Sequence, residues 1–218
     1  MSQLSFFENS APKDPHWSDM PFLVVDTETT GLNHQQNRVI EIAWVLFDKQ
    51  LEVASDARLC AIEGPLPAEI TTLTGIHSDM LVGQPAFSDH MADFLEACSK
   101  ASYLVAYNAN FDRSFIESEF GRAGHTFPEV HWVDPCIHIR EIDRYKKGKR
   151  LSDAAARWGV QMDGAHRALA DAKAAGHLFL KLAPHLKAAS LKELLILENG
   201  WRSEQERQYR AYKARNPS

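Results

Sequence analysis

The sequence has few cysteines, and none of them lie close together. Its 218 residues contain three, Cys60, Cys98 and Cys136, with no CxxC pair among them. A disulfide framework needs paired cysteines, and a structural zinc site needs closely spaced ones. We therefore expect free thiols in a reducing compartment, with no disulfide framework and no structural zinc.

Long apolar runs are also missing. No segment approaches the ~20 consecutive apolar residues that a membrane-spanning helix needs. The first residues, MSQLSFFENSAPKD, lack the basic start and apolar block of a secretory signal. The sequence therefore predicts a cytoplasmic protein without a membrane partner.

The excess of acidic over basic residues is small. A net charge of -5 and a pI near 6.1 argue against a protein that coats nucleic acid through bulk charge. A nuclease that gathers its acids around metal ions stays compatible with this charge. With 44% hydrophobic and 24% charged residues, the chain predicts one ordinary folded domain with appendages.

Residues 22–32, FLVVDTETTGL, bring two acids to the end of an apolar run. The run Phe22 to Val25 predicts a buried strand, and alternate side chains of a strand share one face. Asp26 and Glu28 should therefore point the same way. Two such carboxylates are tolerated mainly when they share a cation or a proton. The alternative is a strand end with two solvated acids.

Apolar periodicity predicts strands and helices in alternation along the rest of the chain. The expected strands are 38–47 and 51–62, which form a hairpin, then 103–106 and the start of a strand-to-helix unit over 131–140. The expected helices are 67–73, 85–99, a segment through residues 115 to 121, 151–158, 166–182, and one or two within 190–218. This alternation predicts an α/β fold whose polar turns meet at one sheet edge.

Three further features leave alternatives open. Glu41 lies inside an apolar run, so it either faces solvent on an edge strand or supports the acids of the neighbouring strand. The basic stretch from Arg144 to Arg150 is either a solvated loop or a phosphate-binding one. His166 precedes Asp171 by five residues, about 140° around a helix, so it approaches Asp171 only from the helix start.

Asp26, Glu28, Asp112 and Asp171 come from three separate places and converge in the predicted fold. Oxygen-rich clusters suit magnesium or manganese, and two such ions can drive phosphodiester hydrolysis. His166 is then a candidate to take the proton from the attacking water. Taken alone, this histidine reads as a capping or surface residue.

The motifs DTETTGL, NANFD and HRALADA together resemble those of the DnaQ-like, DEDD 3′–5′ exonucleases, in the histidine branch. The resemblance covers about residues 20–182. It implies a ribonuclease H-like fold, a five-stranded mixed sheet with three antiparallel strands, flanked by helices. It also implies that the four acids hold two Mg2+ (or Mn2+) and that His166 is the general base. The sister branch has a tyrosine where this chain has Arg167.

The same resemblance implies residues that bind the terminal nucleotide. These substrate-binding candidates are Thr27, Thr29, Gly31, Leu32, Asn108, Phe111 and His166. Many relatives have a histidine where this chain has Tyr107, a departure that bears on the fit of the substrate.

Residues 1–20 predict a flexible arm that contains Gln3-Leu4-Ser5-Phe6-Phe7. This pentapeptide resembles the sliding-clamp motif of bacterial polymerases and repair proteins, with Phe6 in place of the usual leucine. Gln3, Leu4, Phe6 and Phe7 would contact the clamp. The alternative is that these apolar side chains pack back on the domain.

The expected organisation is an arm over 1–20, an exonuclease domain over 21–186 and a helical extension over 187–218. The leading hypothesis is a bacterial, cytoplasmic exonuclease that releases nucleoside 5′-monophosphates from DNA 3′ ends in proofreading or repair. The alternatives are a ribonuclease that trims RNA 3′ ends, and a clamp-tethered module that binds nucleic acid ends without cutting them.

Overall fold

The computed structural model of the chain describes residues 15–162 and 167–216. The strands are β1 (Phe22–Thr29), β2 (Val39–Asp48), β3 (Leu51–Leu59), β4 (Tyr103–Val105) and β5 (Trp132–Val133). The helices are α1 (Ala68–Thr74), α2 (Ser78–Leu81), α3 (Phe87–Ser99), α4 (Ala109–Arg122), α5 (Pro135–Ile142), α6 (Leu151–Arg157), α7 (Ala168–Leu182) and α8 (Leu191–Arg215), with short 3-10 helices η1 (Trp17–Asp19) and η2 (Ala183–His185).

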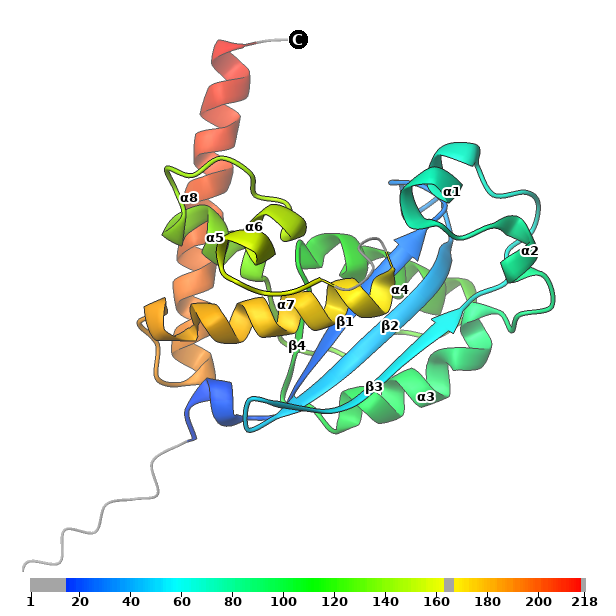
Figure 1. Cartoon of the computed structure of the whole chain (residues 1–218), viewed down its shortest axis with the longest axis horizontal. Coiled ribbons are helices and arrows are strands. Elements are labelled where there is room, and N and C mark those ends of the chain that lie inside the picture. Colours follow the sequence, from blue (N-terminus) through cyan, green and yellow to red (C-terminus); the bar gives the residue numbers. More distant parts are fainter. Residues whose placement is uncertain (1–14, 163–166, 217–218) are drawn as a thin grey trace, which may run out of the picture.

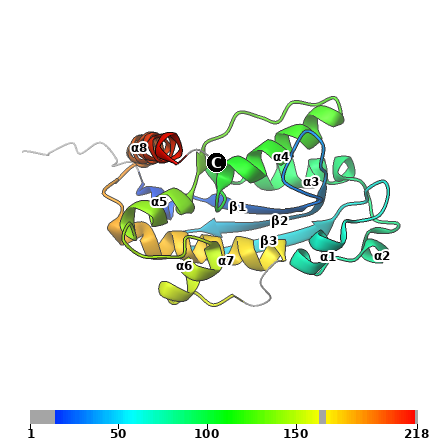
Figure 2. The same cartoon turned by 90° about the horizontal axis from the view of Figure 1, so that it is seen from above.

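The five strands form one mixed sheet in the order β3-β2-β1-β4-β5. β1, β2 and β3 pair antiparallel, whereas β4 and β5 run parallel to β1. Helices α3 and α4 cover one face of the sheet, and α7 covers the other (Figures 1 and 2). The predicted five-stranded mixed sheet flanked by helices is therefore confirmed.

Strand β1 lies at the centre of the sheet, and its alternate side chains enter two different cores. Leu23 and Val25 pack with aromatic and aliphatic side chains of α3 and α4. Phe22 and Val24 pack with the small face of α7 and with Phe179. Side chains at alternate positions of β1 thus meet either α3 and α4 or α7.

Helix α7 packs unusually close to the sheet because Gly176 has no side chain. A Cβ atom at Gly176 would lie 2.4 Å from Cε2 of Phe47 and 3.0 Å from Cγ2 of Val24. No real side chain fits in that space, so the glycine lets the helix backbone approach the strands. The position of α7 over β1 is therefore fixed by direct backbone-to-ring packing.

Some element bounds differ from the sequence expectation. β1 continues beyond Val25 to Thr29 because its polar end still pairs with β2, where Glu28 lies opposite Glu41. Strand β3 ends at Leu59 instead of Ile62. The short helix α2 was not expected, since four residues are too few to show a helical period.

Residue Trp17 anchors the start of the described chain. Its side chain is fully buried, its Nε1 donates to the Ala188 carbonyl at 2.8 Å, and its own carbonyl accepts from the Tyr103 hydroxyl at 2.9 Å. Close packing therefore begins within the segment predicted as an arm. The clamp candidates Gln3, Leu4, Phe6 and Phe7 lie outside the described residues.

Two expectations from the sequence concern the cysteines and the lack of a membrane-spanning helix. Cys60, Cys98 and Cys136 are buried free thiols, as predicted. Among the residues that the structure describes, no helix combines the length and apolar character needed to span a membrane.

Candidate active site

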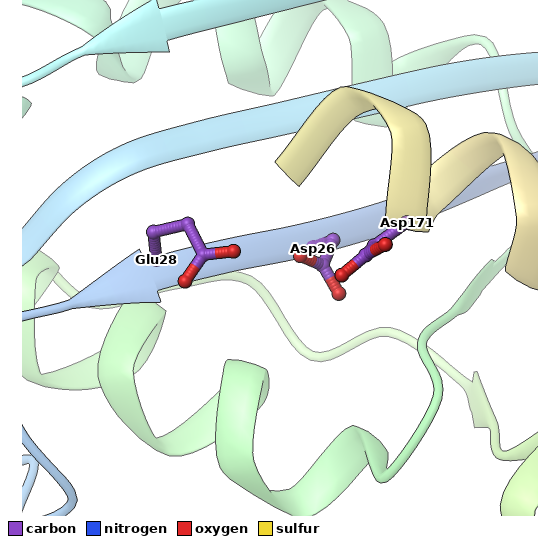
Figure 3. Close-up of side chains that lie close together, drawn as sticks. All are labelled: Asp26, Glu28 and Asp171. Atoms are coloured by element: carbon purple, nitrogen blue, oxygen red, sulfur yellow. The ribbon is translucent and has the colours of Figure 1, made fainter. Parts of the chain in front are cut away.

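Three carboxylates meet where β1 leaves the core, on the face covered by α7. Asp26 and Glu28 have the same parity as Phe22 and Val24, so both point toward α7, which supplies Asp171. One oxygen from each of the three acids lies within 4.8 Å of the others (Figure 3). The structure thus brings together three of the four acids predicted from the sequence.

Asp112 reaches the same strand from the opposite layer. It lies in the first turn of α4, and its Oδ1 accepts from the Thr27 backbone N–H at 2.9 Å and from the Thr27 hydroxyl at 2.8 Å. Thr27 has the parity of Leu23 and Val25, so it faces α4. Asp112 is therefore fixed to β1 beside the other three acids without belonging to their tight group.

Burial and mutual repulsion raise the pKa values of these acids. Burial, followed by the charges of Asp112 and Asp171, raises the pKa of Asp26 well above its usual range. Burial and the charge of Asp171 raise the pKa of Glu28 to about 8. The pKa of Asp112 rises to about 7, mainly through burial and against the hydrogen bonds from Thr27. Near neutral pH the cluster therefore holds protons unless a cation replaces them.

The donor set suits a hard divalent cation. Mg2+ and Mn2+ prefer carboxylate oxygens, and the oxygens of Asp26, Glu28 and Asp171 are close enough to share one ion. A bound cation would offset the repulsion that raises these pKa values. The residues present therefore fit the metal that the sequence predicts.

Glu41 supports this cluster from the neighbouring strand. It is 2% exposed on β2, which lies between β1 and β3, so the solvent-facing alternative is wrong. Its carboxylate accepts from the guanidinium of Arg167 and, through Oε2, from the backbone N–H of Ala168 at 3.0 Å. Glu41 thus holds the first residues of α7, the helix that carries Asp171.

A cavity of about 440 Å³ opens over the acids. Five of the predicted substrate-binding residues line it: Thr27, Thr29, Gly31, Leu32 and Phe111. Leu32 is 87% exposed, so it presents an apolar side chain to whatever enters the cavity. The cavity therefore combines a carboxylate floor with an apolar wall.

The loop after β1 is held tightly at Gly31. The Thr29 hydroxyl donates to the Gly31 carbonyl at 2.7 Å, and a Cβ at Gly31 would lie 2.7 Å from Oδ1 of Asn37. Asn37 in turn accepts from the Asn33 backbone N–H at 2.9 Å. A side chain at Gly31 would therefore have to displace the Asn37 amide, which holds the loop that carries Leu32.

The sequence analysis missed the contribution of α1 to this cavity. Glu69, Ile70, Leu73 and Thr74 line it, together with Tyr107. Leu73 is 54% exposed, so together with Leu32 it puts a second exposed leucine on the wall. The helix itself was expected, but its short sequence carries no sign of which face meets β1.

Asn108 lies apart from the acid cavity. It precedes α4 with a left-handed backbone (φ 71°), and Asp134 accepts from its N–H at 2.9 Å and from that of Ala109 at 3.2 Å. Its side chain is not part of the wall around Asp26 and Glu28; it lines two neighbouring cavities instead. The predicted general base His166 lies outside the described residues.

Comparison with known proteins decides the family. The family model described as Exonuclease (RNase_T) matches residues 23–179. The chain belongs to this exonuclease family. The resemblance to DnaQ-like 3′–5′ exonucleases, drawn from three short motifs, is confirmed, and all four acids lie within the matched region.

Individual relatives agree with this family. The PolC-type DNA polymerase III of Staphylococcus aureus (strain bovine RF122 / ET3-1) is 31% identical over 208 residues, which is 95% of this chain. The chain spans only 14% of the length of that relative. The similarity to this polymerase therefore concerns only a small part of its length.

Two solved structures share the fold. Exonuclease X in complex with 5′ overhanging duplex DNA has a TM-score of 0.61 at 21% identity and covers 81% of this chain and 99% of that chain. The nuclease domain of 3′hExo, described as a DEDDh family member bound to rAMP, has a TM-score of 0.65 at 16% identity and covers 76% and 92%. At these identities the likeness establishes the fold.

Proposed function

We propose that this exonuclease removes nucleoside 5′-monophosphates from DNA 3′ ends in the bacterial cytoplasm, in proofreading or repair. The observation that carries the proposal is the meeting of Asp26, Glu28 and Asp171 within 4.8 Å beside Asp112. The similarity to a polymerase and to a nuclease solved with DNA favours DNA as the substrate.

The four acids act as ligands of divalent cations in this proposal. Asp26, Glu28 and Asp171 would hold a shared ion, and Asp112 would complete a second position from the α4 side. In two-metal phosphodiesterases, bound cations lower the pKa of an attacking water and stabilise charge on the leaving oxygen. Thr27 keeps Asp112 oriented through two hydrogen bonds.

His166 is the proposed general base, since a histidine accepts a proton near neutral pH. The ion pair between Arg167 and Glu41 fixes the chain directly after it.

The apolar wall of the cavity would receive the terminal base. Leu32 and Leu73 are exposed, and Phe111 belongs to the same lining. Apolar and aromatic surfaces bind any base through its flat face, which suits an enzyme that removes each nucleotide in turn. Thr29 and Gly31 hold the loop that presents Leu32.

Digestion of end-labelled oligonucleotides tests this function. Matched single-stranded DNA and RNA, labelled at either end, are incubated with Mg2+, with Mn2+ and with EDTA. We expect stepwise, metal-dependent loss from the DNA 3′ end, which His166→Ala removes. Loss from the 5′ end, or activity that survives EDTA, contradicts the proposal.

RNA is the second candidate substrate. The support is two structural neighbours: the nuclease domain of 3′hExo, described as bound to rAMP, and a 3′-exonuclease described in the 3′-end specific recognition of a histone mRNA stem-loop. Faster removal of ribonucleotides than of deoxyribonucleotides in the same digestion would replace DNA by RNA. Binding without cleavage would instead assign the chain to the non-catalytic module.

Attachment to a sliding clamp is a separate proposal. It is supported by the sequence Gln3-Leu4-Ser5-Phe6-Phe7 and by the position of this motif ahead of the buried Trp17. A pull-down with purified bacterial clamp compares the wild type with the double variant Phe6→Ala, Phe7→Ala. Equal recovery of both proteins excludes the motif as a clamp ligand.

A further inference from the structure

We propose that a basic groove between α5 and α8 binds the backbone of single-stranded substrate several nucleotides before the 3′ end. The basic groove is defined by Arg140, Arg144, Lys149, Arg202 and Tyr209, and its volume is about 610 Å³. The proposal rests on the proposed exonuclease function and names the path by which the polymer reaches that site.

Positive side chains enter the basic groove from three parts of the chain. Arg140 comes from α5, Arg144 and Lys149 come from the loop before α6, and Arg202 comes from α8. Helices α5 and α8 lie side by side in both views, and Gln205 Nε2 donates to the Ile137 carbonyl at 3.1 Å (Figures 1 and 2). The groove is thus formed by packed elements and is open to solvent.

The carboxylates near the basic groove leave part of this positive charge available. Arg144 pairs with Glu141, and Arg202 pairs with Glu198 at 2.8 Å. Arg140, however, makes no ion pair with the described residues, and Lys149 donates to a backbone carbonyl of Asp143. Arg140 and Lys149 can therefore meet phosphate oxygens at little cost in broken ion pairs.

Two acids also line the basic groove and have to be accounted for. Asp134 is 4% exposed and uses its carboxylate to accept from three backbone N–H groups, so it presents little charge to a ligand. Glu206 is exposed on α8, where its Oε2 lies 3.9 Å from Nη2 of Arg210. The cations still outnumber the solvent-facing acids of the groove.

The basic groove adjoins the acid cavity through a smaller cavity that shares lining residues with both. Asn108, Arg140 and Lys149 also line a smaller cavity of about 410 Å³. That cavity is shared with Tyr107 and Asp171, both of which line the acid cavity. A strand whose last phosphate lies at Asp171 can therefore continue past Asn108 into the basic groove.

One face of α8 adds an aromatic contact to the charges. Arg202, Gln205 and Tyr209 are spaced by three and four residues, so they lie on one side of the helix. The Tyr209 side chain is 60% exposed. Cationic side chains that alternate with an exposed ring are typical of surfaces that bind unpaired nucleotides, because the ring stacks on bases. This favours a single strand over a duplex.

The test compares substrates that do and do not reach the basic groove. The variants are Arg140→Gln with Lys149→Gln, and Tyr209→Ala. The control, Lys187→Gln with Lys192→Gln, removes two exposed positive charges outside the groove. KM is measured for a 4-nucleotide and a 20-nucleotide single strand at several salt concentrations. Binding of a fluorescent 20-mer is measured separately by anisotropy in EDTA.

We expect the Arg140/Lys149 double variant to raise the ratio of the 20-mer KM to the 4-mer KM about tenfold. The binding constant K falls as salt rises, and each phosphate contact makes this dependence steeper. Removal of two contacts should therefore reduce the magnitude of the slope of log K against log salt by roughly 1.4 for a single strand. Tyr209→Ala weakens 20-mer binding severalfold without changing that slope, and the control changes neither. If the wild type and the Arg140/Lys149 double variant give the same KM ratio and the same salt slope, the proposal is overturned.

The two proposals fail in different ways. If the wild type degrades neither oligonucleotide, the exonuclease function fails, while the anisotropy measurement still decides on the groove. If cleavage is normal and the groove variants bind the 20-mer as the wild type does, only the groove fails. If the groove variants weaken binding of a blunt duplex as much as binding of the 20-mer, the proposed preference for a single strand is wrong.

Discussion

Arg167 and Glu41 form a forked ion pair at the point where α7 begins. Nη2 of Arg167 lies 2.7 Å from Oε1 of Glu41, and Nε lies 3.3 Å from Oε2. Glu41 is buried opposite Glu28 in the strand register, whereas the Arg167 side chain is 45% exposed. The pair therefore connects the position of α7 to the electrostatics of the acid cluster.

Arg167→Met should lower both stability and activity. The buried Glu41 carboxylate loses its charged partner, which costs on the order of 1–3 kcal/mol in unfolding free energy. Because Arg167 lowers the pKa of Glu28, its removal raises that pKa and moves the acid limb of the pH–rate profile to higher pH. Arg167→Lys keeps the charge and should keep the limb in place. If the acid limb of the pH–rate profile lies at the same pH in Arg167→Met and in the wild type, this electrostatic role is ruled out.

The metal-free protein should become less stable as pH rises from about 4 to 8. Glu28 and Asp112 have pKa values of about 8 and 7 in the folded protein, against 4.5 and 3.8 for the free groups. The folded state then binds more protons than the unfolded state, so unfolding is favoured by rising pH until both groups ionise. Thermal melts in EDTA measure this, and Glu28→Gln should show a smaller decline. A melting temperature that rises through this window in wild type but not in the variant contradicts the assignment.

Asp171→Asn should abolish cleavage while leaving the protein folded. The substitution removes a metal ligand, so the rate should fall on the order of 10³-fold or more. It also removes a charge that raises the pKa values of Asp26 and Glu28, so the metal-free melting temperature should not fall. Asp79→Asn, on exposed α2, is the matched control. Retained cleavage by the Asp171 variant would exclude the metal site.

Gly176→Ala should push α7 away from the sheet. The added methyl group meets Phe47 at 2.4 Å, and such overpacking costs about 1–3 kcal/mol. Since α7 carries Asp171, the rate should fall together with stability. Gly200→Ala is the control, because a Cβ there meets nothing within 4 Å and an exposed helical alanine stabilises by up to about 1 kcal/mol. Unchanged melting temperature and rate for Gly176→Ala would show that the helix adapts.

Much of the fold follows from local sequence pattern. The two-residue period of β1 predicts that Asp26 and Glu28 share a face, and the Ala-rich run predicts α7. These are short-range properties of the chain. The residue at which β1 ends was not predictable from the apolar run, because pairing with β2 holds the polar end of the strand.

Contacts between distant residues explain what the sequence did not reveal. Arg167 and Glu41 are 126 residues apart, and no pattern in either segment identifies the other as its partner. Leu73 enters the acid cavity because α1 folds over the end of β1, and its own helix is too short to show a face. Asn108 lies beside the acid cavity instead of in it because Asp134 holds its backbone in a left-handed turn.

The buried carboxylate of Glu198 connects α8 to the residues at the start of α5. Its Oε2 accepts from the Asp134 backbone N–H at 3.0 Å and contacts Nε2 of His138 at 2.9 Å, so α8 supports the residue that holds Asn108. Expression of a shorter chain that stops at residue 186 would leave these two buried groups without their acceptor. We therefore expect the first half of α8, which also packs Leu194 into the core shared by β1 and α7, to unfold together with the sheet.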